Sequence, residues 1–250
     1  MSDTSRLVGG DAFRDFAARR RSTRDFLPTP IAPELIDDIV SDAMTAPSWS
    51  NTRPYMVAVA SGEVRDRIAT EFTRRWDEGS AALRGNWWRK ALFALRGGLP
   101  RSDYRILRRY PTDLQERSHK IGRDMYAHLG IDRGDRAGRD AQWRRNFDFF
   151  GAPVEIFIFV HGGLEPFSAS DAGLFMQNLM LSAHARGLGT CAQGAAAVWP
   201  DVVRAEFDVP AQYKLLCGIA LGYPTEASIN SFGAERLPAS VITVPPRSNR

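Results

Sequence analysis

The sequence predicts a single α+β domain, residues 1–250, in which helices flank a small buried sheet. Two short runs, residues 154–160 (VEIFIFV) and 215–221, are rich in β-branched, aromatic and other apolar residues, as is typical of core strands. Residues 33–44 repeat apolar side chains with the 3.6-residue period of an amphipathic helix. A chain of 250 residues, 44% hydrophobic and 25% charged, is long enough to bury a sizeable core.

The N-terminal part of the chain predicts two helices and one strand. A first helix is expected to begin near Asp11, a good N-cap, and to carry apolar side chains such as Phe13 inward. A second begins at Pro33, which suits the first helical turn, and is expected to end at Pro47. Residues 55–61 are mostly apolar and predict a short strand.

The C-terminal part contains the helix that is expected to lie deepest in the protein. Residues 171–186 are apolar on most sides, a pattern typical of a central helix, and Gly187 is expected to end it. From Pro238 onward the chain is rich in proline and predicts an extended tail.

Residues 63–150 are expected to form a basic helical insertion within the single domain. The whole chain has a net charge of +4, whereas residues 65–145 contain 20 Lys and Arg and 11 Asp and Glu, a net charge of +9. Trp87 and Trp88 open a basic amphipathic stretch that resembles a membrane-surface helix. A lone aromatic cluster in a long insertion usually packs on its own protein, so we expect a lid or a dimer contact instead.

Several function classes lack their sequence signatures. Cys191 and Cys217 are too few for a disulfide framework, and the four histidines show no ligand spacing, so no metal is expected. Neither a Rossmann nor a P-loop glycine motif is present. Nucleic-acid binding is suggested only by a pI of 9.3 and is not expected. No apolar run reaches membrane-spanning length and no signal peptide is visible, which predicts a cytoplasmic protein.

Residues 20–24 (RRSTR) are the strongest candidate for a binding site. Arg20, Arg21 and Arg24 can surround one multiply charged anion, and the Ser22 hydroxyl can complete the cradle. Phosphate is the anion that this chemistry favours. The alternative for such a basic run is a solvated face or a nucleic-acid patch.

Four further segments follow this cluster in a fixed order: residues 46–55 (APSWSNTRPY), 187–194 (GLGTCAQG), 221–224 (LGYP) and 236–238 (RLP). Together the five resemble the FMN-dependent nitroreductase family, and the resemblance runs from about Arg20 to Pro238. Residues 145–153 (RNFDFFGAP) and segments before them are similar to the branch that reduces nitrobenzoates and other nitroaromatics.

The resemblance implies a nitroreductase-like fold, in which helices flank a central, mostly antiparallel sheet and two chains interlock as a homodimer. The helix at residues 171–186 would lie at the centre of that dimer, and the tail strand would cross to the partner's sheet. The active site would then straddle the interface between the two subunits.

The function implied is an FMN-dependent oxidoreductase that moves hydride from NADPH or NADH to a nitroaromatic or similar electron-poor aromatic substrate by ping-pong exchange. FMN carries out such chemistry itself, so no catalytic side chain is expected. Reductive dehalogenation, enoate reduction or flavin fragmentation on the same fold is the alternative. A non-catalytic flavin-binding or redox-sensing protein is another.

The family motifs also imply contacts for particular residues. Arg20, Arg21, Ser22 and Arg24 match residues that contact the FMN phosphate, ribityl chain and pyrimidine edge, and Arg236 matches a basic residue that closes on the phosphate. A cation near the pyrimidine edge has a physical role, because reduced flavin is an anion there.

Two further segments match positions beside the isoalloxazine. Pro47, Ser48 and Asn51 match a loop that packs on the ring system bound by the other subunit; the alternative is a plain helix-ending loop. The backbone N–H groups of Gln193 and Gly194 match the position next to flavin N5, where a donor stabilises developing charge. The alternative there is that the glycines only shape a turn.

No chemical role is assigned to four nearby side chains. Many relatives have Gln and Trp where this chain has Arg53 and Tyr55, so no role is assigned to those two. Cys191 is expected to be a small buried residue and not a redox thiol. His184 is expected to pack in the core and not to donate protons.

Overall fold

The computed structural model describes residues 8–84, 86–95, 98–106 and 108–247. Its strands form one antiparallel sheet in the order β1-β2-β4-β3. They are β1 (Tyr55–Ser61), β2 (Val154–His161), β3 (Gly189–Gln193) and β4 (Tyr213–Gly222). The three strands predicted from the sequence are confirmed, with extensions of one or two residues, while β3 was not predicted.

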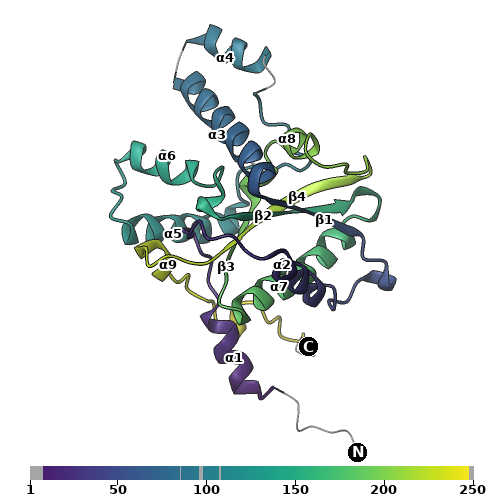
Figure 1. Ribbon diagram of the computed structural model, residues 1–250. Helices are drawn as coiled ribbons and strands as arrows, with labels where there is room; N and C mark the ends of the chain where they lie inside the picture. The colour runs from purple at the N-terminus through teal and green to yellow at the C-terminus, as the bar shows by residue number, and fades with distance from the viewer. Residues whose placement is uncertain (1–7, 85, 96–97, 107, 248–250) are drawn as a thin grey trace, which may run out of the picture.

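The α-helices of the described chain surround this sheet (Figure 1). They are α1 (Gly10–Arg19), α2 (Pro33–Ala43), α3 (Gly62–Arg84), α4 (Trp87–Leu95), α5 (Thr112–His128), α6 (Arg136–Arg144), α7 (Phe167–Ala185), α8 (Pro200–Arg204) and α9 (Ser228–Ser231). None of the helices in the described ranges combines the length and apolar character needed to cross a bilayer.

The sheet has a helical layer on each face. On one face α2 and α7 pack against Ile156 and Ile158, which are fully buried. On the other face α3 packs against Phe157 and Phe159, and Phe72 of α3 meets the Phe157 ring edge to face at 6.4 Å. Every residue from Val154 to Val160 is buried, which explains why β2 lacks the alternation of a half-exposed strand.

The helix α7 is longer and more one-sided than the sequence suggested. It begins at Phe167, four residues before the predicted start, and Gly187 follows its end with a positive φ of 75° that suits glycine. Leu179 is fully buried against the sheet, whereas Leu174 on the outer side is 44% exposed. The outer face of α7 therefore has no cover from its own chain over Leu174.

The expectation that the first helix carries Phe13 inward is wrong. No residue of α1 is buried, Phe13 is 55% exposed, and Figure 1 shows the helix projecting away from the sheet. Its contact with the body is the Phe16 ring, 5.0 Å from that of His184 on α7. An amphipathic pattern shows that one face of a helix is apolar, but it does not show which chain packs against that face.

Two other boundaries differ from the expectations. The helix that begins at Pro33 ends at Ala43, because a turn through Met44 and Thr45 ends it before Pro47 is reached. The tail after Pro238 contains a short 3₁₀ turn, Ala239–Val241, and exposes Ile242 and Val244. Exposed apolar residues in a tail are what a segment that docks on another chain would have.

Candidate active site

The segment that leaves α1 places the arginine cluster beside strand β3. Ser22 forms a parallel bridge with Thr190, and the Thr23 N–H donates to the Thr190 carbonyl oxygen at 2.9 Å. A Cβ at Gly189 would lie 2.3 Å from Thr23 Oγ1, so the glycine permits this close approach. The chain therefore passes along β3 directly after Arg20 and Arg21.

A cavity of about 250 Å³ opens at this place. Its lining residues are Arg19, Arg20, Arg21, Thr23, His184, Gly187, Leu188, Gly189, Thr190, Pro224 and Asn230. Three of them are arginines, whereas no Asp or Glu lines the cavity. Such an arrangement fits an anion and disfavours a cation.

The cations of this site lie close enough to affect one another. Burial lowers the pKa of Arg20, and the nearby charge of Arg236 lowers it further. Burial also lowers the pKa of His184, followed by the charges of Arg20 and Arg19. In the described part of the chain no carboxylate forms an ion pair with Arg20 or Arg236. Unpaired like charges held together are what a phosphate would neutralise.

The remaining members of the predicted cluster surround the same strand. The Arg24 N–H donates to Asn230 Oδ1 at 2.8 Å, and the Arg21 guanidinium donates to the Ser231 carbonyl oxygen at 3.0 Å. Ser22 hydrogen-bonds with Cys191, whose pKa burial raises to about 11. Cys191 is thus a buried thiol at neutral pH, as expected, and not a reactive thiolate.

Gln193 and Gly194 lie at the other end of β3, on the same edge of the sheet. The Gln193 side chain is turned inward, 3% exposed, and its Nε2 donates to the Asn146 carbonyl oxygen at 2.9 Å. A side chain at Gly194 would meet nothing within 4 Å. The backbone at Gly194 is therefore open to an approaching ligand, whereas the Gln193 amide group is not.

The loop with Pro47, Ser48 and Asn51 is held in a strained conformation. Ser50, Asn51 and Arg53 have φ values of 49°, 57° and 45°, a region that non-glycine residues seldom occupy. The Ser48 hydroxyl oxygen accepts a hydrogen bond from the Arg53 N–H at 2.9 Å. Several strained residues together are typical of functional loops, where the surrounding structure enforces the shape.

Asp171, at the start of α7, fastens this loop to the body of the protein. Its Oδ2 accepts a hydrogen bond from the Trp49 N–H at 2.9 Å, and the Trp49 and Phe167 rings lie 4.2 Å apart. Neither Asp171 nor Asn230, which holds Arg24, was predicted from the sequence. Their partners lie more than 100 residues away in the chain, so no local pattern indicates either contact.

The loop and the arginine cluster lie at opposite ends of α7. The loop touches Asp171, near the first turn, while the arginine cavity includes His184 and Gly187 at the last turn. Thirteen residues of helix separate Asp171 from His184, a span of about 20 Å. A single chain therefore gathers one predicted set of site residues beside β3, namely Arg20, Arg21, Ser22, Arg24 and Arg236. The other predicted set, Pro47, Ser48 and Asn51, lies at the opposite end of α7 in the same chain.

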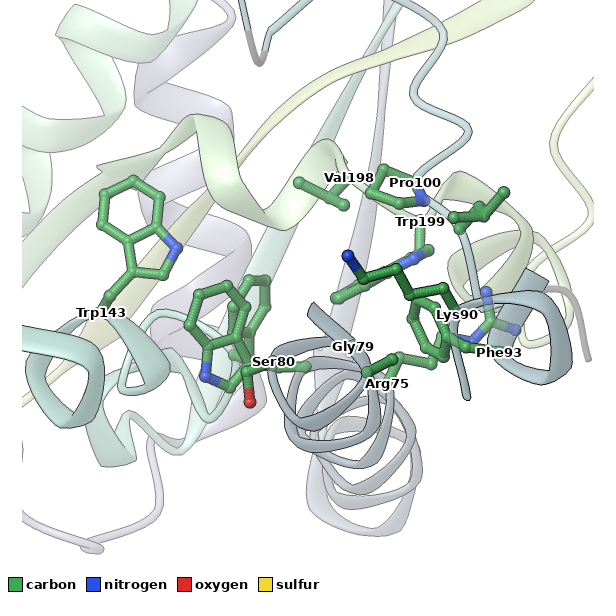
Figure 2. A pocket seen from close by; sticks show the side chains of 13 residues that line it. Arg75, Gly79, Ser80, Lys90, Phe93, Pro100, Trp143, Val198 and Trp199 are labelled. Carbon is green, nitrogen blue, oxygen red and sulfur yellow. The ribbon is translucent and has the colours of Figure 1, made fainter. Parts of the chain in front are cut away.

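A larger cavity of about 400 Å³ lies in the basic region (Figure 2). Its walls are mainly apolar and include five aromatic residues, Trp76, Phe93, Trp143, Phe147 and Trp199. Figure 2 shows Lys90 reaching across the cavity, and no carboxylate of the described chain forms an ion pair with it. Trp87 and Trp88, the aromatic residues singled out from the sequence, do not line this cavity.

About half of the Lys and Arg side chains described within residues 65–145 are paired with carboxylates. Arg75 contacts Glu71 and Asp201, each at 2.7 Å, and so is not available to a ligand. Other cations with carboxylate partners are Arg67, Arg74, Arg84, Lys120, Arg123 and Arg144. Pairing therefore takes part of this charge out of contact with a substrate, but it leaves other described cations, Lys90 among them, without a carboxylate partner.

The fold and this site define an α+β protein with an anion cradle along one sheet edge. Residues 17–223 match the nitroreductase family model, so the chain belongs to the nitroreductase family. It is similar to a 4-nitrobenzoate reductase of Pseudomonas putida, with 35% identity over 93% of this chain and 95% of that protein. It is also similar to a nitrobenzene nitroreductase of Ectopseudomonas oleovorans, with 35% identity over 84% and 85% of the two chains.

Solved structures agree with these relatives. The FMN-dependent nitroreductase NfnB from Mycobacterium smegmatis, in complex with NADPH, superposes with a TM-score of 0.80 and 31% identity over 95% of this chain and 99% of that chain. An FMN- and NADPH-dependent NfnB from a sphigopyxis strain gives a TM-score of 0.81 at 29% identity, over 94% and 99% of the two chains. The predicted family and fold class are confirmed.

Proposed function

We propose that this chain is an FMN-dependent nitroreductase that uses NADPH as electron donor and reduces nitroaromatic compounds. The observation that carries the proposal is the unpaired cation cluster of Arg20 and Arg236 beside β3. The similarity to a 4-nitrobenzoate reductase and to the FMN-dependent nitroreductase NfnB supports both the substrate class and the cofactor. NADPH is preferred to NADH because both NfnB structures are described with it.

In this proposal the FMN phosphate lies in the cavity lined by Arg20 and Arg21, and Arg236 closes over it. Ser22 and Arg24 line the path along β3 toward Gly194, whose backbone is open to a ligand. When bound, FMN supplies the hydride transfer itself. The protein's part is to hold the anion, to place a backbone donor at its reactive end and to limit the access of water.

We further propose that the working enzyme is a homodimer with shared active sites. The loop of Pro47, Ser48 and Asn51 is held at Asp171, about 20 Å along α7 from His184, which lines the arginine cavity of the same chain. A second copy can supply that loop. The uncovered apolar residues Phe13, Leu174 and Ile242 support an interface of this kind.

The same proposal includes the domain organisation of the chain and the cellular compartment of the protein. Residues 63–150 would be an insertion within one domain, and α3 contributes Ile68 and Phe72 to the shared core. A cytoplasmic location rests on the sequence-based expectation alone, and cell fractionation tests it.

The decisive experiment is an anaerobic visible spectrum of the purified protein. We expect a yellow protein whose flavin bands bleach when NADPH is added and return when a nitroaromatic such as 4-nitrobenzoate follows. A flavin that stays oxidised with NADPH and NADH would favour the non-catalytic alternative. Bleaching that an electron-poor nitroaromatic does not reverse would favour other flavin chemistry on the same fold.

A further inference from the structure

The centre of the sheet contains a carboxyl group that the proposed function does not use. Glu155, on β2, is 0% exposed, and neither of its oxygens has a hydrogen-bond partner within the described structure. A buried polar group without a partner carries a large desolvation cost. Such a group calls for a structural reason.

The register of the sheet places this carboxyl next to Gln193. Glu155 faces Ala220 on β4, and Ala220 faces Cys191 on β3. Two residues along, Phe157 faces Gly218, and Gly218 faces Gln193. Because residues two apart share a face of the sheet, Glu155 and Gln193 lie on the same face, on either side of Gly218.

Gly218 leaves the space that the carboxyl occupies. A Cβ built on Gly218 would lie 1.9 Å from Glu155 Oε1 and 2.8 Å from the Ala196 Cβ. The Glu155 carboxyl therefore lies over the bare backbone of Gly218, beneath the 3₁₀ turn Gly194–Ala197 that follows Gln193. Any side chain at position 218 would displace it.

The buried side chain of Gln193 also lacks a hydrogen-bond partner for one of its atoms. Its Nε2 donates to Asn146, but its Oε1 is buried and has no donor within the described residues. A protonated carboxyl has the O–H donor that this oxygen lacks, whereas a carboxylate has none. One hydrogen bond would thus satisfy two buried groups at once.

The surroundings favour the neutral form of Glu155. Burial raises the pKa of this carboxyl well above its ordinary value, and the charge of Arg65 opposes the shift only in part. The Arg65 guanidinium donates to the carbonyl oxygens of Ala152 and Asp148 and pairs with Asp66, so it makes no ion pair with Glu155. The other titratable groups near it are two buried thiols, Cys191 and Cys217, whose own pKa values burial raises.

We propose that the Glu155 carboxyl donates a hydrogen bond to Gln193 Oε1, directly or through one buried water, and thereby braces the turn that begins at Gly194. Glu155 is a positioning residue in this account. It acts through Gln193 on the backbone that faces the ligand. The consequence for the position next to flavin N5 rests on the proposed function, whereas the hydrogen bond itself does not.

Infrared spectroscopy of the holoprotein at pH 8 tests the hydrogen bond directly. We expect the C=O stretch of a protonated carboxyl, which Glu155→Gln removes and the exposed control Glu226→Gln retains. Gln193→Met is expected to shift this band without removing it, because the acceptor is lost. A spectrum with no such band, or a band that Gln193→Met leaves in place, overturns the proposal.

A second test needs only variants of position 155. A carboxyl whose folded-state pKa is raised contributes stability below its unfolded-state pKa of 4.5, and that stability is lost as the pH rises through the folded-state value. Glu155→Gln, which keeps an N–H donor and does not ionise, should therefore gain in Tm over the wild type as the pH rises above the unfolded-state pKa of 4.5. Glu155→Met should be less stable than Glu155→Gln at every pH. A Tm difference between wild type and Glu155→Gln that is independent of pH contradicts a neutral acid.

The effect at the flavin is measured separately, as the rate constant of anaerobic bleaching by NADPH. Glu155→Met should slow bleaching by about tenfold or more, while Glu155→Gln should stay near the wild type. Equal rates in all three proteins, with the infrared result intact, would overturn the role at N5 and leave the hydrogen bond. A wild type that does not bleach would instead refute the proposed function.

Discussion

Arg20 is the residue whose environment most clearly requires an anion. Burial and the charge of Arg236 lower its pKa, and no carboxylate of the described chain pairs with it. We predict that Arg20→Ala weakens FMN binding by about 2 to 5 kcal/mol, the usual cost of removing one partner from a desolvated charge pair. Equilibrium flavin titration of the apoprotein measures this.

Arg14→Ala is the matched control for that variant. Arg14 lies on α1, which ends just before Arg20, but it is exposed and pairs with Asp11 at 2.8 Å. Its removal should leave the affinity for FMN unchanged. If Arg20→Ala keeps full flavin occupancy after dialysis, the phosphate is not bound at this cluster.

At the scale of single elements, the strained loop depends on one carboxylate. Asp171 Oδ2 is the acceptor for the Trp49 N–H. Asp171→Ala removes a hydrogen bond to a charged group and should lower the free energy of unfolding by about 1.5 to 3 kcal/mol. Nitroreductase activity should fall more than FMN affinity, because the phosphate cluster lies at the other end of α7.

Asp171→Asn keeps a side-chain oxygen as acceptor and should recover most of the lost stability. Urea unfolding and flavin titration of the two variants make the comparison. A loss of FMN affinity as large as that of Arg20→Ala would show that the loop and the phosphate cluster are not separate parts of the site.

The basic region as an element predicts a charge preference that depends on Lys90. Of the two described cations that line the aromatic cavity, Arg75 is paired with Glu71 and Asp201, so Lys90 is the candidate for attracting anionic aromatics. We predict that kcat/KM is higher for 4-nitrobenzoate than for its methyl ester at low salt, and that this preference fades as salt is added.

Lys90→Met should reduce the preference for the acid, whereas Arg84→Met should not, because Arg84 is paired with Asp140 at 3.2 Å. Steady-state kinetics with both substrates across a salt series measures the effect. Equal values for acid and ester in the wild type at low salt would reject charge steering by this region.

At the scale of the whole molecule, the separation of the two half-sites predicts that subunits complement each other. Arg20→Ala damages the phosphate cluster, and Asn51→Asp places a charge in the loop at the other end of α7. Each homodimer should be nearly inactive. After equal amounts are unfolded together and refolded at random, about half of the dimers are mixed and each has one intact site, so about a quarter of wild-type activity should return.

Light scattering gives the independent check of this arrangement. The wild type should be a dimer with two FMN per particle. A monomer that retains FMN, or mixed samples without recovered activity, would show that each chain builds its own complete site.

Local patterns in the sequence determined much of this structure. The apolar runs at 55–61, 154–160 and 215–221 became strands because β-branched and apolar residues suit a sheet that packs in the core, and the period of residues 33–43 produced a helix. The five residues 189–193 (GTCAQ) contain one β-branched side chain and two small apolar ones, so β3 gave no comparable signal. Its place in the sheet depends on pairing with β4.

The sequence by itself therefore established the family, the core strands and the residue types of an anion site, since these depend on composition and short spacing. Only the tertiary structure decided which of those residues meet. It left α1 outside the core, turned the Gln193 amide inward to Asn146, and fastened the loop of Ser48 to Asp171, 122 residues from Trp49. It also paired about half of the described cations of the basic region with carboxylates, among them Asp201, Asp140 and Asp77 on other helices. Contacts of that kind join distant parts of the chain, and they form because the whole molecule packs favourably around them. A short stretch of sequence does not contain that information.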